Sequence, residues 1–392
     1  MRAGNQTLLK KNNQRAIADY IIQNGPISRA DLSKKLKISK PTVSANVAEL
    51  IDMHLLKEIG YSETDIGKKP MLVDFDKDFR FVLALDFISY IAVNKISVAV
   101  CNLYCDPIFI DTINFPPNFD SNFVKESLPQ SIMELFKRYN VSIDKIAKMV
   151  ISAPTVWYDD DHVNFECRTG EIVNLSEIFK PYFKNRIVVK NDINLAALGE
   201  KYFGVGKDVD NLFFAWIGVG VGGGIILDGE LYEGKALNGG ELAYATIYNE
   251  DLDRFEYFRD ITDMNGIKRY IQSNYKKAEK SSIADQLLNG TFTLDMMITA
   301  SLQGDMFCTK FAKHVGKITA ILISNLSSVI DLEMVIVGGD YARFGDVFLN
   351  EIKIMTKDIP TTKVSITTPQ HSNSAMYGAF KFGAEHIISK LI

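Results

Sequence analysis

Residues 26–56 constrain the fold most, because they contain two short helical patterns with an abrupt stop between them. Ser28 and Asp31 have the spacing of a capping box, which marks the start of a helix. Leu32 and Leu36 then lie one turn apart, and the helix is expected to end near Ile38. The pattern predicts the first helix of a helix–turn–helix, packed through one apolar side.

A second helix is predicted to begin at once. Ser39 can cap it, and Pro41 suits its first turn. Its apolar residues repeat at helical spacing and form one buried stripe of Val43, Val47, Leu50 and Ile51. The opposite side is expected to be polar near the helix start, and its members with the cap are Ser39, Lys40, Thr42, Ser44 and Asn46. These side chains are predicted to meet bases and phosphates, as those of a recognition helix do.

The residues after this helix have the pattern of a wing. Residues 54–59 read as a strand, residues 60–69 as a polar loop, and residues 71–75 as a returning strand. Lys68 and Lys69 at the end of the loop are expected to neutralise phosphates or enter a minor groove.

Charge supports a DNA-binding part. Residues 1–70 contain 12 Lys and Arg against 7 Asp and Glu, a net charge of +5, whereas the remainder contains 32 against 41, a net charge of −9. The alternative is a helical interaction module with a solvated basic face, because helix–turn–helix patterns also occur by chance.

Length and composition bound the remaining possibilities. A chain of 392 residues with 47% hydrophobic residues is expected to form two or three domains. No apolar stretch is long enough to cross a bilayer and residues 1–13 lack a signal-peptide core, so a cytoplasmic protein without a membrane partner is predicted. The cysteines are expected to be reduced thiols without a metal, because they are few and scattered: Cys101, Cys105, Cys167 and Cys308.

From residue 81 onward, strand-like and helical patterns alternate, as in an α/β protein. One series has predicted strands at 81–87, 91–101, 108–113 and 146–152 and a helix at 123–139; the other has strands at 186–190, 211–227 and 334–337 and helices at 194–203, 310–330 and 374–390. Two such series predict a bilobal protein with a ligand cleft. The predicted domains are 1–78, the winged helix–turn–helix, and 79–392, the bilobal dimerisation part, with lobe 1 at 79–190 plus the C-terminal helix and lobe 2 at 191–373.

Four motifs in the larger part carry a family resemblance. They are VKNDINLAALGE at 189–200, IGVGVGGGIILDGELYEG at 217–234, Gly240-Glu241, and VIVGG at 335–339. Residues 186–247 in particular resemble the ROK family of sugar kinases and repressors, and with the winged helix the resemblance covers nearly the whole chain. It implies the actin-like ATPase fold shared with hexokinase. It also implies a homodimer or dimer of dimers that binds a palindromic double-stranded DNA operator and responds to a sugar.

Polar residues in these motifs suit a sugar effector. Sugar hydroxyls need groups that donate and accept hydrogen bonds in fixed directions, and Asn191, Asp192 and Glu241 supply such groups. The resemblance adds Asn174, at a position that helps line the family's sugar pocket, and Tyr244, at the position of a histidine that contacts zinc and sugar. In ROK kinases the carboxylate at the Asp192 position is the general base, whereas an ordinary helix N-cap is the alternative for this residue. Ligand is expected to close a cleft between Asp192 on one side and Glu241 on the other.

The phosphate-binding motifs depart from the kinase pattern. ROK kinases carry Asp-x-Gly-Gly-Thr on the first hairpin, where glycines let the backbone approach a phosphate. This chain has Asp86-Phe-Ile-Ser-Tyr90, whose Phe87, Ile88 and Tyr90 are expected to fill the phosphate's space. The second loop has Val219 in place of the family's threonine but keeps its glycines, Gly218, Gly220, Gly222, Gly223 and Gly224. A tight turn between two strands is the favoured explanation for these glycines.

The family's zinc motif is also missing, since Gly240-Glu241-Leu-Ala-Tyr244 continues to Phe258 without a cysteine. No metal and no cofactor are therefore expected. The sequence predicts a sugar-responsive transcriptional regulator, a repressor, whose kinase-derived domain has lost phosphoryl transfer and is not an enzyme. Two alternatives stay open: an active ROK sugar kinase with a DNA-binding head, and a constitutive DNA-binding dimer without an effector.

Overall fold

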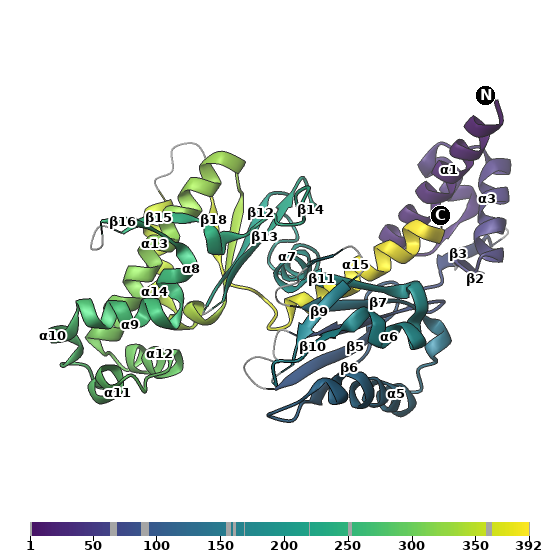
Figure 1. Cartoon of the computed structure of the whole chain (residues 1–392). Coiled ribbons are helices and arrows are strands. Elements are labelled where there is room, and N and C mark those ends of the chain that lie inside the picture. The colour runs from purple at the N-terminus through teal and green to yellow at the C-terminus, as the bar shows by residue number, and fades with distance from the viewer. Residues whose placement is uncertain are drawn as a thin grey trace. The chain divides into compact units, whose positions relative to one another are not determined.

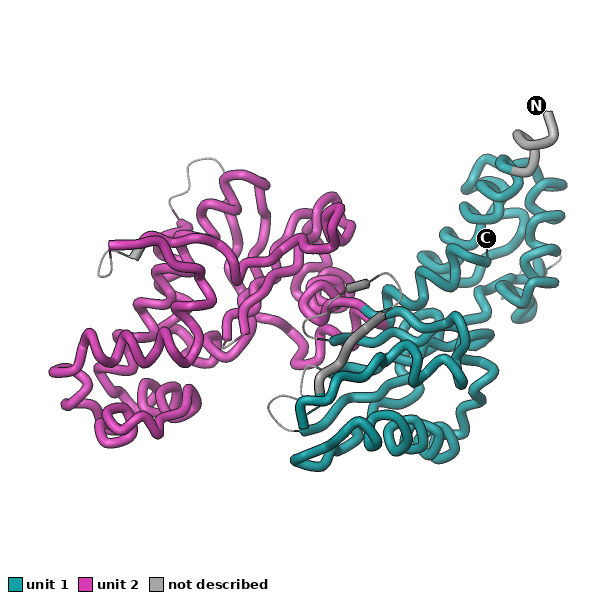
Figure 2. The backbone as a smooth tube through the Cα atoms, viewed as in Figure 1, with its two compact units in different colours: residues 1–189, 380–392 teal, residues 190–379 magenta. Residues whose placement is uncertain are grey.

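The chain forms two compact units, Met1–Val189 with Phe380–Ile392, and Lys190–Ala379 (Figure 2). The computed structural model describes residues 2–62, 69–87, 94–153, 158–159, 162–167, 169–218, 220–249, 253–357 and 363–391, without the side chains of 2–7, 158–166 and 249. Lys68, Ile88, Tyr90 and Val219 lie outside the described residues. No helix in the described ranges combines the length and apolar character needed to cross a membrane.

The N-terminal part of the first unit is a winged helix. In chain order it contains α1 (Arg2–Asn24), β1 (Ile27–Ser28), α2 (Arg29–Leu36), α3 (Lys40–Asp52), β2 (Leu56–Tyr61) and β3 (Met71–Phe75) (Figure 1). The strands form an antiparallel sheet in the order β1-β3-β2. Both predicted caps are confirmed, because the hydroxyls of Ser28 and Ser39 accept hydrogen bonds from the N–H groups of Asp31 and Thr42 at 3.1 and 3.3 Å. The boundary at residue 78 stays a prediction.

Helix α1 was not predicted, yet it completes the core of this head. Its Ile17, Ala18 and Ile21 are fully buried. Gln14 also donates a hydrogen bond to the carboxylate of Glu49 on α3 at 2.8 Å. Helix α1 therefore packs against the buried side of α3 and leaves the first turn of α3 uncovered.

A five-stranded sheet forms the centre of the rest of the first unit. Its order is β11-β7-β4-β5-β6, in which β5 runs antiparallel to β4 and β6, and β7 runs parallel to β4. The strands are β4 (Phe81–Asp86), β5 (Lys95–Cys101), β6 (Pro107–Asn114), β7 (Ile146–Ala153) and β11 (Ile187–Asn191). The predicted strands of the first series are thus confirmed within their described residues.

Helices cover both faces of this sheet. α5 (Leu128–Arg138) and α6 (Leu175–Phe183) pack their apolar residues, including Ile132 and Phe179, against the face that carries Leu83. α15 (Ser374–Leu391) covers the other face, where a Cβ at Gly383 would lie 2.5 Å from a methyl group of Val82. The smaller elements are η1 (Phe123–Ser127), η2 (Ile143–Lys145), β8 (Tyr158–Asp159), β9 (His162–Glu166), β10 (Ile172–Asn174) and η3 (Lys184–Arg186). The predicted helix at 123–139 is therefore a π-helical turn followed by α5.

The second unit repeats this strand pattern. Its sheet has the order β14-β13-β12-β17-β18, with β12 to β14 as an antiparallel meander and β17 and β18 parallel to β12. The strands are β12 (Leu212–Ile217), β13 (Val221–Leu227), β14 (Glu230–Tyr232), β17 (Met334–Gly338) and β18 (Ser365–Thr367). A separate hairpin pairs β15 (Thr246–Asn249) with β16 (Arg254–Tyr257).

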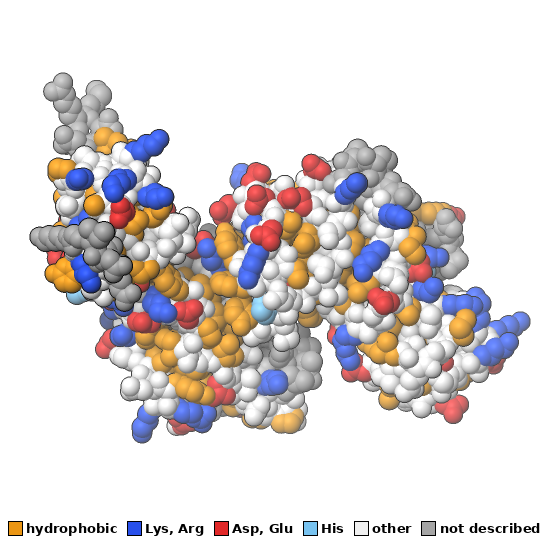
Figure 3. Space-filling model, turned by 180° about the vertical axis from the view of Figure 1, so that it is seen from behind, with side chains coloured by type: hydrophobic (Ala, Val, Ile, Leu, Met, Phe, Trp, Pro, Cys, Tyr) orange, Lys and Arg blue, Asp and Glu red, His pale blue; other side chains and the backbone are white. Residues whose placement is uncertain are grey.

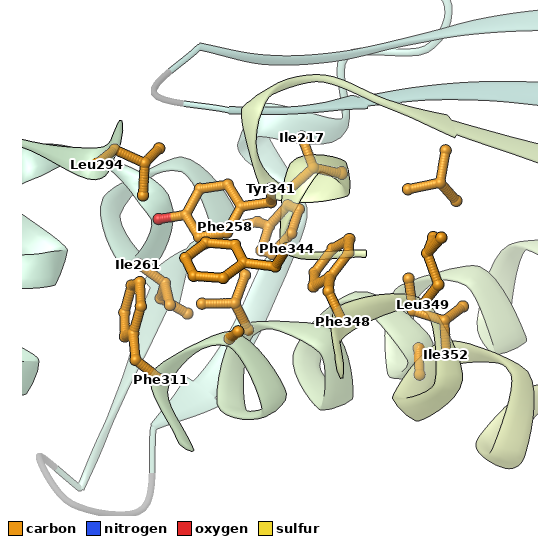
Figure 4. Close-up of a cluster of buried hydrophobic side chains, with 14 of the residues drawn as sticks. Ile217, Phe258, Ile261, Leu294, Phe311, Tyr341, Phe344, Phe348, Leu349 and Ile352 are labelled. Atoms are coloured by element: carbon orange, nitrogen blue, oxygen red, sulfur yellow. The ribbon is translucent and has the colours of Figure 1, made fainter. Parts of the chain in front are cut away.

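The helices of the second unit surround an aromatic core. Figure 4 shows Tyr341 among Phe258, Phe344 and Phe348, all buried, and the Tyr341 hydroxyl donates to the backbone oxygen of Thr262 at 2.8 Å. The helical elements are α7 (Asp192–Phe203), η4 (Leu242–Tyr244), α8 (Phe258–Thr262), α9 (Met264–Ser273), α10 (Tyr275–Ala278), α11 (Ala284–Asn289), α12 (Leu294–Leu302), α13 (Met306–Ile330), η5 (Asp340–Phe344) and α14 (Asp346–Thr356). Of these, only α7 and α13 were predicted.

A buried carboxylate joins the end of α7 to the start of α15. Glu200 is fully buried and accepts a hydrogen bond from the Ser374 hydroxyl at 2.5 Å. Its oxygens also accept from the backbone N–H groups of Val205, Gln370 and His371, each at 3.1 Å. Four hydrogen-bond donors surround the carboxylate, and their hydrogen bonds compensate the free-energy cost of burying its charge.

The face of β7 toward α15 contains a buried lysine. Lys148 is 6% exposed, and its ammonium donates to the imidazole of His386 at 3.2 Å. Burial, with a smaller contribution from nearby Lys390, lowers the pKa of Lys148 from 10.5 to about 8. The folded protein therefore releases this proton at a lower pH than the unfolded chain does.

Lys148→Met is expected to stabilise the first unit at neutral pH. Between pH 8 and 10.5 the unfolded chain binds the proton that the folded protein has lost, so the wild-type free energy of unfolding rises with pH in that window. The variant should flatten this rise and gain on the order of 1 kcal/mol at pH 7, because it no longer buries a charged ammonium. Urea unfolding across this pH range measures both effects. Lys125→Met, at an exposed site, is the control, and the same pH slope in both variants would contradict the assignment.

Candidate DNA-binding surface and effector site

The first turn of α3 presents polar groups to solvent. Ser39, Lys40 and Ser44 are exposed, whereas Thr42 is half-buried. The hydroxyl groups of Ser39 and Thr42 lie 2.7 Å apart and hydrogen-bond each other at the start of the helix. The exposed set at the start of α3 is therefore one cation and two hydroxyl-bearing side chains.

The prediction that Asn46 lies on this polar face is wrong. Asn46 is 5% exposed, and its amide donates to the backbone oxygen of Thr42 at 2.8 Å. The residue lies roughly 60° around the helix from Val43, and an apolar stripe of ordinary width includes that direction. Asn46 thus packs on the buried side, where it cannot reach a base without a rearrangement.

The wing is tied to the start of α2 by an ion pair. The guanidinium of Arg29 lies 2.9 Å from the carboxylate of Glu58 on β2. Lys69, close to the start of β3, is exposed. Figure 3 shows Lys and Arg side chains gathered on one face of this N-terminal head. Such a surface suits the phosphates of DNA.

The start of α7 holds Asn191 and Asp192. The Asn191 side chain caps the helix, because its oxygen accepts from the N–H groups of Ile193 and Asn194 at 2.9 and 3.0 Å. Asp192 is the first helical residue, is 4% exposed and accepts from the N–H of Ile193 at 2.8 Å. The N-cap that the sequence offered as an alternative role for Asp192 therefore belongs to Asn191.

Glu241 and Tyr244 flank the short helix η4. Glu241 is exposed and follows Gly240, whose φ of +87° is a left-handed conformation that glycine adopts without strain. Tyr244 is 52% exposed, and the Arg259 guanidinium lies 4.9 Å from its ring centre and donates to its hydroxyl at 3.2 Å. The two side chains are thus available to a ligand from solvent.

The glycines of β13 let the start of α7 and the turn at Gly240 both lie close to this strand. A Cβ at Gly222 would overlap the side chain of Ile193 on α7, and one at Gly224 would lie 2.6 Å from the Cβ of Ala197. On the other face of the strand, a Cβ at Gly223 would lie 2.9 Å from the Gly240 oxygen. Asp192 and Glu241 therefore lie next to neighbouring residues of one strand in one unit. The expectation that they belong to opposite sides of an interlobe cleft is wrong.

Two further glycines form the loop between β12 and β13. A Cβ at Gly218 would lie 2.6 Å from the carboxylate of Asp340, whereas Gly220 has open space around it. Packing thus accounts for Gly222, Gly223 and Gly224 without a phosphate. It leaves Gly218 and Gly220 unexplained, because the carboxylate beside Gly218 is the movable end of a side chain.

The first hairpin differs from expectation at Phe87. Its side chain is fully buried and makes an edge-to-face contact with Phe115, so it lies in the core and does not fill a phosphate site. The preceding Asp86 is 2% exposed and accepts a hydrogen bond from the Ser152 hydroxyl at 2.9 Å. The strand β4 ends at Asp86, one residue before the predicted end at residue 87.

Asn174 belongs to the first unit, whereas the other candidate effector residues belong to the second. Its oxygen caps α6 by accepting from the Glu177 N–H at 3.2 Å. Its amide nitrogen is buried and has no partner among the described protein groups. That nitrogen is a donor available to a ligand or water.

The hairpin β15–β16 follows Glu241 where the resembled family carries its zinc motif. The carboxylate of Glu256 is 7% exposed and lies 2.6 Å from the guanidinium of Arg254 and 3.6 Å from that of Arg269. All four cysteines are buried. No group of three metal-binding side chains occurs in the described ranges.

Comparison with known proteins agrees with this architecture. A model described as the ROK family matches residues 118–252, and a model of the winged helix-turn-helix DNA-binding domain matches residues 11–57. The chain is 27% identical over 376 residues to a xylose repressor of Caldicellulosiruptor bescii, covering 89% of this chain and 88% of that protein. It is 28% identical over 173 residues to a glucokinase of Halalkalibacterium halodurans, covering 43% of this chain and 52% of the glucokinase.

A solved structure extends the match over the whole length. The crystal structure of a ROK family transcriptional regulator, a homologue of the E. coli MLC protein, has a TM-score of 0.76 and covers 98% of this chain and 99% of that one at 20% identity. The expected fold, a winged helix–turn–helix joined to an actin-like ROK part, is confirmed. The chain therefore contains a ROK family domain, matched at residues 118–252, and a winged helix–turn–helix DNA-binding domain, matched at residues 11–57.

Proposed function

We propose that this protein is a transcriptional repressor that binds double-stranded DNA through its winged helix and responds to a sugar. The observation that carries the proposal is the alignment of 89% of the chain, head and ROK part together, with a protein named xylose repressor. The exposed first turn of α3 and the basic head supply the surface that such a role needs. Xylose is the first effector to test.

The effector is proposed to bind at Asn191, Asp192, Glu241 and Tyr244. Glu241 and Tyr244 offer an exposed carboxylate and an aromatic ring beside the start of α7. Sugars are held by such combinations of directed polar groups and ring faces. A sugar that binds one arrangement of the protein more tightly shifts the population toward it and so changes the affinity for DNA.

The operator is proposed to be palindromic and the protein a homodimer or dimer of dimers. A dimer with two winged helices reads two half-sites related by the same two-fold axis, about one helical turn or a multiple of it apart. Selection of binding sequences from random duplex DNA tests this, since a palindromic readout should yield inverted repeats.

The main rival is an active sugar kinase, favoured by the retained Asp192. We place catalysis second because the full-length relative is named a repressor, whereas the glucokinase match covers 43% of the chain. The first hairpin also lacks the family's phosphate-binding glycines, having Phe87 and Ile88 in that segment.

The protein is expected not to phosphorylate sugars. Incubation with ATP, magnesium and a panel of sugars including xylose should give no sugar-dependent ADP release above the background without sugar. Turnover that depends on a sugar and disappears in Asp192→Asn would establish the kinase instead.

The DNA-binding role predicts a reduced salt dependence when basic side chains of the head are removed. Lys40→Ala combined with Lys69→Ala should weaken binding to all sequences, and the slope of log affinity against log salt should fall by about 2 if each lysine contacts one phosphate. Ser44→Ala should instead alter sequence preference. Lys276→Ala on α10 is the control. An unchanged slope in the double variant would remove both lysines from the interface.

The effector role predicts that Glu241→Ala blunts the sugar response. Loss of a charge-assisted hydrogen bond costs about 1.5–3 kcal/mol, so the sugar concentration that gives half the change in DNA binding should rise by one to two decades. Operator affinity without sugar should stay unchanged, as in the exposed control Glu230→Ala. If operator affinity does not respond to any sugar in the wild-type protein, the constitutive alternative replaces the sensor.

A further inference from the structure

An ion pair of low exposure lies next to the candidate effector residues. The ammonium of Lys190 lies 2.9 and 2.7 Å from the two carboxylate oxygens of Glu233, and the two side chains are 15% and 21% exposed. By contrast, the pair of Arg343 with Asp295 in the same unit is 56% and 72% exposed. Solvent and salt screen a pair of low exposure far less than a surface pair.

Each partner belongs to a different effector-binding segment. Lys190 directly precedes Asn191 and Asp192, so its backbone is continuous with the first turn of α7. Glu233 follows β14 and closes the loop that leads to Glu241. The N–H of Gly239 donates to the backbone oxygen of Glu233 at 2.8 Å, which brings the two ends of residues 233–239 together.

The loop end is also packed too closely to shift alone. A Cβ at Gly239 would lie 2.9 Å from the carbonyl carbon of Glu233, and one at Gly240 would overlap the oxygen of Gly223. A displacement of Glu233 would therefore move Gly239 and, one residue beyond Gly240, Glu241. Because the two ends of the loop are bonded to each other, the position of Glu233 determines the position of Gly239.

We propose that Lys190 and Glu233 are positioning residues of the effector site, which hold the Glu241 segment at a fixed place beside Asn191 and Asp192. The inference rests on the proposed effector site. The pair acts between segments 43 residues apart in the chain. It fixes the carboxylate of residue 241 before a sugar arrives, so that binding does not have to order the loop.

The test compares Lys190→Met, Glu233→Gln and the exchanged pair Lys190→Glu with Glu233→Lys. The first measurement needs no sugar: amide hydrogen exchange at residues 234–242, and at the Gly239 N–H in particular, should accelerate at least tenfold in each single variant. It should return most of the way in the exchanged pair. Arg343→Met, which breaks the exposed pair, is the control and should leave this segment unchanged.

The second measurement is the affinity for xylose, by calorimetry, in the same proteins. Each single variant should bind about tenfold more weakly and the exchanged pair should recover, while operator affinity without sugar stays constant. A fall in melting temperature without a change in local exchange or sugar affinity would mean a merely structural role and would overturn the proposal. Glu233→Gln is nearly isosteric, so it keeps the test decisive if Lys190→Met does not fold.

The two hypotheses fail in different ways. Unchanged exchange at residues 234–242 in both single variants rejects the positioning pair whether or not any sugar binds. The other outcome is that exchange accelerates in the variants but the wild-type protein binds neither xylose nor any other sugar of a panel. That result rejects the effector role and also the positioning proposal, and the ion pair is then a loop contact only.

Discussion

Three consecutive glycines in β13, Gly222 to Gly224, let the second unit bring three backbone segments together. Along β13, Gly222 and Gly224 admit α7 on one face and Gly223 admits the turn at Gly240 on the other. A methyl group at any of these positions would overlap a neighbouring atom. Protein cores are close-packed, so they have little free space to accommodate such an overlap. The position of Asp192 relative to Glu241 thus depends on the absence of side chains between them.

This constraint separates the glycine motif from nucleotide binding. In a kinase the same residues let the backbone approach a phosphate, but here tight packing is sufficient reason to keep most of them. The glycines at 222–224 can therefore persist for packing reasons alone, whether or not a phosphate binds beside them. The glycine motif alone says little about whether a member of the family transfers phosphate.

Local sequence signals predicted the fold better than they predicted the site. The caps at Ser28 and Ser39 and the strands β4 to β7 follow from spacing and alternation, which depend on nearby residues. α1 was missed although Ile17, Ala18 and Ile21 have helical spacing, because the surrounding residues are largely polar. The polar amide of Asn46 suggests an outward position, but its angle on the helix places it on the buried side. No local pattern could join Lys190 to Glu233, since only the tertiary fold brings those residues together.

The carboxylate of Glu200 gives the molecule a mechanical property. It lies near one end of α7, whose other end carries Asp192, and it accepts hydrogen bonds from Ser374, Gln370 and His371 at the origin of α15. A buried charge cannot release its donors cheaply, so α7 and the first turn of α15 move as one rigid body. α15 is continuous from Ser374 to Leu391, and its residues from Phe380 onward belong to the unit that contains the winged helix. Loss of this carboxylate would therefore leave the Ser374 hydroxyl and the N–H groups of Gln370 and His371 without their acceptor, and the first turn of α15 would lose its attachment to α7.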